Sequence, residues 1–143
     1  MGHRGRSKEN SQITQDKKII LVVEDNQDVR DLVVQILNAD GFHIFSAVDG
    51  KNALAILNLN QIDLVLLDVM MPGISGLEVL SEIRTGSNKR IREVPVMMMT
   101  AKSGLEDIDQ ALALGANSYV VKPFRGITLR EKVRNLLDLP TSK

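Results

Sequence analysis

The chain has 143 residues, 43% of them hydrophobic and 25% charged, and its 18 basic and 18 acidic side chains cancel to a net charge of zero. This composition favours one globular domain over wholesale disorder, and the charge balance gives no overall attraction to nucleic acid or anionic membranes. The absence of cysteine excludes disulfides and thiolate metal sites, and no apolar run approaches the ~20 residues that span a bilayer.

Residues 1–17 are polar and lack the apolar stretch of a signal peptide. We interpret them as a flexible polar leader, or as a linker left from a larger protein. No linker divides residues 18–140, so one ordered domain is expected there, followed by a short tail at 141–143.

From residue 19 onward, β-rich apolar runs alternate with segments whose apolar residues recur at helical spacing. In chain order the sequence predicts a strand at 19–23, a helix at 29–37, a strand at 43–48, a helix at 53–57, a strand at 64–69, a helix at 77–83, a strand at 94–100, a helix at 105–112, a strand at 118–121 and a helix at 129–137. This alternation predicts an α/β protein, a single doubly wound parallel sheet of five βα units with helices on both faces. The methionines at 97–99 are expected to pack in its core.

Chemically active side chains fall where the predicted strands end. Glu24 and Asp25 follow the first strand, and Asp68, Thr100 and Lys122 lie at the ends of the third, fourth and fifth. Because the carboxyl ends of parallel strands meet at one edge of a sheet, these side chains should gather there. Asp68 stands out because it interrupts an apolar run, and a buried acid needs a partner or a function.

Three neighbouring carboxylates repel one another, and a bound divalent cation would relieve this repulsion. Oxygen ligands suit Mg²⁺, and a lysine and a hydroxyl beside the metal would complete a site for a phosphoryl group. A central carboxylate can itself be the nucleophile and form an aspartyl phosphate. Taken singly, each residue has a simpler interpretation: Asp25 or Asn26 could cap a helix, Thr100 could end a strand, and Lys122 could lie in a solvated turn before Pro123.

Four segments combine these residues in a specific order and spacing. They are VVEDN at 22–26, LLDVMMPGISGLEVL at 66–80, VMMMTA at 96–101 and SYVVKPF at 118–124. Together they resemble the receiver domain of two-component response regulators, most of all the single-domain, CheY-like chemotaxis type. The resemblance covers residues 18–139 and implies a receiver domain over 18–140 with the flavodoxin-like strand order 2-1-3-4-5.

The resemblance also implies a role for each site residue. Asp68 matches the phosphoacceptor, and Lys122 and Thr100 match the lysine and the hydroxyl that contact the phosphoryl group. The residues that match Mg²⁺ ligands are Glu24, Asp25, Asp68 and the backbone carbonyl of Met70. In the family the bond that joins Lys122 to Pro123 is typically cis.

Phosphorylation is expected to draw Thr100 inward, with Tyr119 following as an aromatic switch. This would change an output face formed by the fourth helix, fifth strand and fifth helix, expected to include Asp109, Leu114, Tyr119, Arg130 and Arg134. The implied partners are a sensor histidine kinase or a histidine phosphotransfer protein, and a downstream protein target on that face. A cytoplasmic location is expected, with no direct contact to nucleic acid and no membrane insertion.

Two variable positions and several other interpretations stay open. Met70 and Lys102 occupy positions that influence phosphoryl lifetime in the family, and an apolar Met70 cannot orient water as an amide could. The domain would catalyse its own phosphorylation and dephosphorylation without turning over external substrates. The alternatives are a pseudo-receiver that acts as a protein-interaction module, or a receiver excised from a hybrid histidine kinase. A haloacid dehalogenase needs a second aspartate where Met70 stands, and no glycine-rich turn follows the first strand to bind a dinucleotide.

Overall fold

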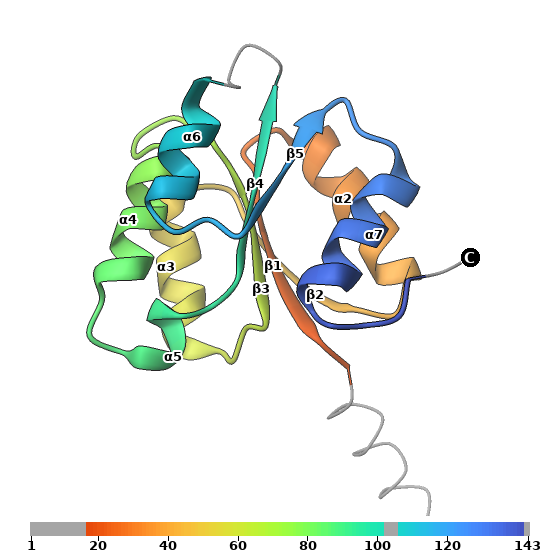
Figure 1. The fold of residues 1–143 in the computed structure, drawn as a ribbon, viewed down its shortest axis with the longest axis horizontal. Coiled ribbons are helices and arrows are strands. Elements are labelled where there is room, and N and C mark those ends of the chain that lie inside the picture. The colour runs from red at the N-terminus through yellow and green to blue at the C-terminus, as the bar shows by residue number, and fades with distance from the viewer. Residues whose placement is uncertain (1–16, 102–105, 142–143) are drawn as a thin grey trace, which may run out of the picture.

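The computed structural model describes residues 17–101 and 106–141. Five parallel strands form one sheet in the order β2-β1-β3-β4-β5 (Figure 1), which confirms the predicted α/β fold and its strand order. The strands are β1 (Ile19–Val23), β2 (His43–Ala47), β3 (Leu64–Asp68), β4 (Val96–Ala101) and β5 (Ser118–Lys122). The helices within these residues are α2 (Gln27–Ala39), α3 (Gly50–Leu59), α4 (Gly76–Thr85), α5 (Lys89–Arg92), α6 (Glu106–Ala113) and α7 (Gly126–Leu136).

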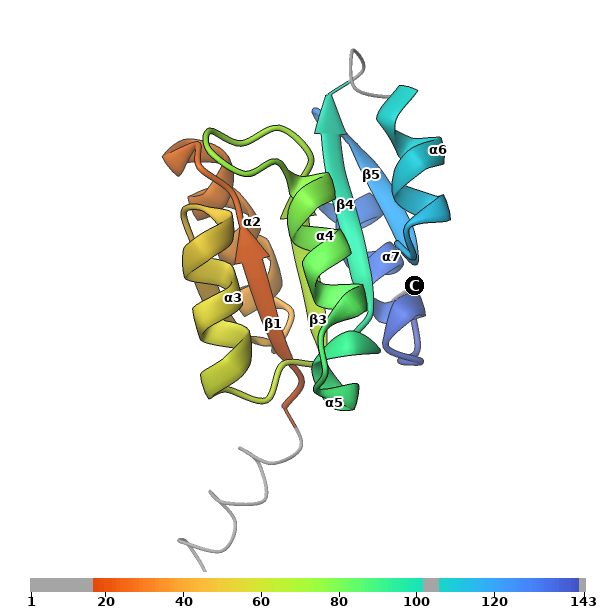
Figure 2. The same ribbon diagram turned by 90° about the vertical axis from the view of Figure 1, so that its left-hand side faces the viewer.

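Helices cover both faces of the sheet, so alternate strand residues enter two separate cores. Helices α2 and α7 lie on one face, and α3, α4 and α6 lie on the other (Figures 1 and 2). Within β4, Met97 and Met99 pack in the cluster with α2 and α7, whereas Met98 packs in the opposite one. All three are fully buried, which confirms their predicted place in the core. Burial on both sides explains why the central strands β1, β3 and β4 read as largely continuous apolar runs.

Side-chain caps begin α2, α3 and α4, the helices that follow β1, β2 and β3. The side chain of Asn26 accepts a hydrogen bond from Val29 N at 3.1 Å and so begins α2. Asp49 caps α3 through Asn52 N at 2.8 Å. These bonds satisfy amides that have no partner within the helix and so stabilise the first turns of α2 and α3.

The structure differs from the predicted elements mainly at their ends. The one-turn helix α5 was not predicted, because its four residues carry one apolar side chain and are too short to show a period. The strand predicted at 94–100 begins two residues later, after Pro95. The leader up to residue 16, Lys102, and residues 142–143 lie outside the described residues. Among the helices of 17–101 and 106–141, none has the length and apolar character needed to cross a membrane.

Gly76 allows the first turn of α4 to lie directly on the end of β3. Its amide donates to Val69 O at 2.9 Å, and a Cβ at this position would overlap the backbone carbonyl oxygen of Asp68. We expect Gly76→Ala to lower the free energy of unfolding by about 1–3 kcal/mol, because backbone must move to admit the methyl group. Chemical denaturation measures this loss. Gly86→Ala is the control, since its nearest contact at 3.5 Å is ordinary packing, and equal losses in both variants would contradict the argument.

Candidate functional site

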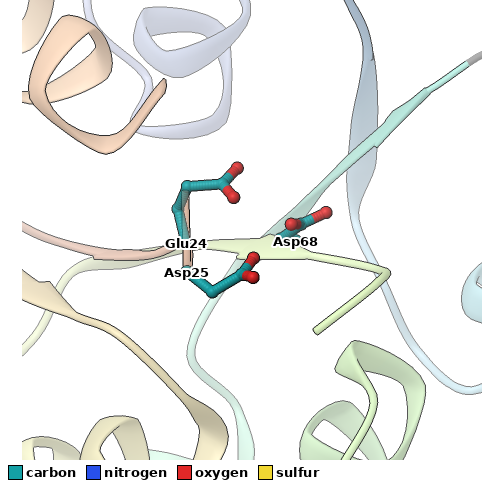
Figure 3. A group of neighbouring side chains, drawn as sticks. All are labelled: Glu24, Asp25 and Asp68. Carbon is teal, nitrogen blue, oxygen red and sulfur yellow. The ribbon is translucent and has the colours of Figure 1, made fainter. Parts of the chain in front are cut away.

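Three acidic side chains meet at the carboxyl end of the sheet. Glu24 and Asp25 directly follow β1, and Asp68 is the last residue of the neighbouring strand β3. One carboxylate oxygen from each lies within 4.8 Å of the others (Figure 3). Glu24 and Asp68 are buried, with 1% and 5% of their surface exposed, whereas Asp25 is exposed. The structure therefore brings together the three acids that the strand ends predicted.

Lys122 places a positive charge between the two buried acids. Its Nζ donates a hydrogen bond of 2.6 Å to Oε1 of Glu24 and lies 3.4 Å from Oδ2 of Asp68. Lys122 is the last residue of β5 and Glu24 follows β1, so β3 and β4 lie between the strands that carry the two partners. The bond to Pro123 is cis, as the resemblance predicted. The ammonium offsets part of the charge that the acids concentrate here.

The two buried carboxyls have opposite protonation preferences. Burial raises the pKa of Asp68 to about 7, the hydrogen bond with Glu24 acts in the same direction, and the charge of Lys122 opposes both. Burial alone would also raise the pKa of Glu24, but hydrogen bonds with Lys122, Asp68 and the Asn26 amide outweigh it and hold that pKa below its usual value. In the absence of a cation, Glu24 therefore carries the negative charge and Asp68 retains a proton near neutrality.

This arrangement predicts how stability depends on pH. The pKa of Asp68 rises from 3.8 in the unfolded chain to about 7, so between about pH 4 and pH 7 the folded state holds a proton that the unfolded state has lost. In chelator-treated buffer, the free energy of unfolding relative to Asp68→Asn is expected to fall with rising pH across this window. The expected fall is on the order of 2 kcal/mol, given about 1.4 kcal/mol for each pKa unit and the opposing shift of Glu24.

Denaturation at several pH values, with and without Mg²⁺, measures this slope. Saturating Mg²⁺ is expected to abolish it in the wild type, because the metal binds the deprotonated carboxylate. A wild-type slope equal to that of Asp68→Asn in chelator would contradict the raised pKa.

The donor set fits a hard divalent cation. All three acids offer oxygen, and the pKa of Asp68 is raised chiefly by burial and further by the hydrogen bond with Glu24. Mg²⁺ prefers oxygen ligands of this kind and would relieve the repulsion. The structure shows the amide of Met70 donating to Oδ1 of Asp68 at 3.3 Å. A ligand role for the carbonyl of Met70 stays a prediction.

Thr100 lies at the same edge, but its hydroxyl is bonded elsewhere. It follows Met99, the residue that pairs with Asp68 across the sheet, and it is 1% exposed. Its Oγ1 donates to the carbonyl of Ala101 at 3.1 Å, so contact with a phosphoryl group on Asp68 would require this hydroxyl to turn. Asn26, and not Asp25, caps α2, which leaves the carboxylate of Asp25 available at the site.

Arg30 supports the acidic pair in a way that sequence analysis missed. Its Nη1 donates to the backbone carbonyls of Glu24 at 2.9 Å and of Asp25 at 3.4 Å. These hydrogen bonds stabilise the backbone of the turn between β1 and α2, and they bring a second positive charge near the acids. The sequence feature that could have indicated this contact is an arginine in the first turn of the helix that follows the acidic pair.

The predicted output face corresponds to α6, β5 and α7. Tyr119 on β5 is half-buried, and Nζ of Lys132 lies 5.3 Å from the centre of its ring. Both residues line a shallow cavity of about 310 Å³. The placement of Arg134 on this face was wrong: its Nε bonds Asp40 at 2.9 Å and its guanidinium lies over Phe42. Arg134 is therefore held against the end of α2 by a partner distant in sequence.

Comparison with known proteins establishes the class to which this fold and site belong. The family model of the response regulator receiver domain matches residues 20–134. The chain belongs to this family.

Similar proteins include both complete regulators and isolated receivers. "Uncharacterized transcriptional regulatory protein YrkP" of Bacillus subtilis (strain 168) is 43% identical over 114 residues, which are 80% of this chain and 47% of that protein. Among solved structures, the chemotaxis response regulator CheY4 of Vibrio cholerae has a TM-score of 0.78 at 30% identity, covering 85% of this chain and 99% of its own. The receiver domain of NtrX from Brucella abortus has a TM-score of 0.77 at 35% identity, with the same coverage. The chain spans about half the length of the curated relatives it matches.

Proposed function

We propose that this chain is a phosphoacceptor in two-component signal transduction, and that Asp68 takes a phosphoryl group from a histidine kinase or a histidine phosphotransfer protein. The observation that carries the proposal is the buried carboxyl of Asp68, with Lys122 3.4 Å away and Glu24 and Asp25 beside it. A buried acid with both a counter-charge and a cation-binding cluster is suited to act on a transferring anion.

In the proposed reaction, an oxygen of Asp68 forms a bond to phosphorus while the P–N bond of phosphohistidine breaks and its electron pair stays on the imidazole. The ammonium of Lys122 offsets the charge of the phosphoryl oxygens. The hydroxyl of Thr100 turns from the carbonyl of Ala101 to donate to one of these oxygens. Mg²⁺, held by the three acids and the carbonyl of Met70, would supply further charge neutralisation when bound.

The same movement would carry the signal to the output face. As the hydroxyl of Thr100 turns toward the phosphoryl group, Tyr119 moves into the space it leaves and away from Lys132. The surface formed by α6, β5 and α7 then differs between the two states, which gives a downstream protein target a basis for discrimination. The half-buried ring of Tyr119 and the cavity beside it support this interpretation.

Intact-mass measurement tests the proposal. The protein is incubated with acetyl phosphate, a small phosphodonor, in Mg²⁺ and in parallel with chelator. We expect one phosphoryl adduct per chain in Mg²⁺ and a large reduction without it. If no adduct forms at any Mg²⁺ concentration or with any donor, the proposal fails in favour of a pseudo-receiver that binds partners independently of phosphate.

A further inference from the structure

The five methionines of the described residues differ sharply in exposure. Met97, Met98 and Met99 are fully buried, and Met71 is half-buried against the core that contains α3 and α4. Met70 has 68% of its surface exposed. Since oxidation of a thioether requires contact between sulfur and oxidant, a dissolved peroxide reaches Met70 far more readily than the buried three.

Exposure alone would mean little, because other large apolar side chains of this protein are also exposed. Leu59, for example, has 82% of its surface exposed. Met70 differs in its position, two residues beyond Asp68 at the start of the connection from β3 to α4. Its amide donates to Oδ1 of Asp68 at 3.3 Å. The residue that carries this exposed thioether is therefore hydrogen-bonded through its backbone amide to the carboxyl of Asp68.

The chemistry available to this sulfur is oxidation. The chain has no cysteine, so thioethers are the only sulfur groups it can present to an oxidant. A sulfur lone pair attacks one oxygen of hydrogen peroxide, the S–O bond forms, the O–O bond breaks, and the second oxygen leaves as water after proton transfer. The product is a sulfoxide, which methionine sulfoxide reductases return to the thioether.

We propose that Met70 is a peroxide-sensitive modification site whose oxidation shortens the lifetime of the phosphoryl group on Asp68. This inference rests on the proposed phosphoacceptor function. An apolar thioether offers water no strong hydrogen-bond acceptor, whereas a sulfoxide oxygen does. A water held beside the phosphoryl group would hydrolyse the aspartyl phosphate faster, by roughly two- to tenfold for one added hydrogen bond.

The experiment compares the wild type with Met70→Leu and with the matched control Met71→Leu. Each protein is treated with limiting hydrogen peroxide, and peptide mass mapping gives the order in which methionines are oxidised. The proteins are then phosphorylated with acetyl phosphate in Mg²⁺, the donor is removed, and the loss of the adduct is followed by intact mass. Treatment with a methionine sulfoxide reductase tests reversal.

We expect Met70 to be oxidised before Met71 and well before Met97–Met99. Peroxide treatment should accelerate phosphoryl loss in the wild type and in Met71→Leu, but not in Met70→Leu, and the reductase should restore the original rate. Equal oxidation of Met70 and Met71, or a normal adduct with an unchanged lifetime after oxidation, would overturn the inference alone. Failure of the untreated protein to form any adduct would overturn the proposed function, and this inference with it.

Discussion

Replacing Asp68 with Asn is expected to abolish the phosphoryl adduct that the wild type forms with acetyl phosphate in Mg²⁺. An amide has nearly the shape of a carboxylate but is a far weaker nucleophile, so the covalent step loses its acceptor. Loss of a nucleophile of this kind reduces rates by on the order of 10⁴-fold or more. Intact mass measured over time, at equal donor and Mg²⁺ concentrations, gives the ratio of the wild-type and variant rates of adduct formation.

Asp31→Asn is the matched control for this experiment. Asp31 is an exposed residue of α2, outside the acidic cluster, and its replacement removes one carboxylate without touching the site. The control is expected to form the adduct at the wild-type rate. An adduct on Asp68→Asn at a comparable rate would show that another group accepts the phosphoryl and would remove Asp68 from its proposed role.

Replacing Lys122 with Met is expected to cause the largest loss of stability, about 3 kcal/mol, because it leaves Glu24 charged and buried without its cation. Glu24 is 1% exposed and loses the 2.6 Å bond to Nζ. The loss should shrink as pH falls, because Glu24 without Lys122 takes up a proton more easily. Chemical denaturation at several pH values measures both effects. The adduct should also form more slowly, since Lys122 no longer offsets phosphoryl charge.

Two further variants separate this loss from a general effect of removing a lysine. Lys51→Met changes an exposed residue in the first turn of α3 and is expected to alter stability little. Adding Glu24→Gln to Lys122→Met removes the unbalanced charge and should recover a large part of the loss, which a double-mutant cycle quantifies. A double variant less stable than Lys122→Met would mean that the ion pair is not the source of the effect.

The fold could be predicted largely because its signals are local and repeated. The central strands β1, β3 and β4 are largely continuous apolar runs, and each long helix shows its own period, so the βα alternation is visible in the sequence. The grouping of Glu24, Asp25 and Asp68 also followed, because the carboxyl ends of parallel strands share an edge. The strand order did not follow from periodicity and came from the family resemblance. The chemical roles of the site residues remain predictions.

Contacts between distant segments could not be predicted. Arg134 forms an ion pair with Asp40 across 94 positions, and Arg84 donates a hydrogen bond to the carbonyl of Gly115 across 31 positions, although neither pair shares a sequence pattern. The opposite protonation preferences of Glu24 and Asp68 depend on burial and on the position of Lys122, which only a folded structure defines. Sequence patterns therefore identified which residues lie together, but not which of the two buried carboxyls keeps its proton.

The ion pair of Lys122 with Glu24 also has a consequence for protein synthesis. The two residues are 98 positions apart, and β5 is the last strand to leave the ribosome. A nascent chain that has emerged only through β4 contains all three acids, Thr100 and Arg30, but not Lys122. At about 5–20 residues per second, this state lasts seconds. The pairing of Glu24 with Lys122 is therefore completed only when β5 joins the edge of the sheet beside β4.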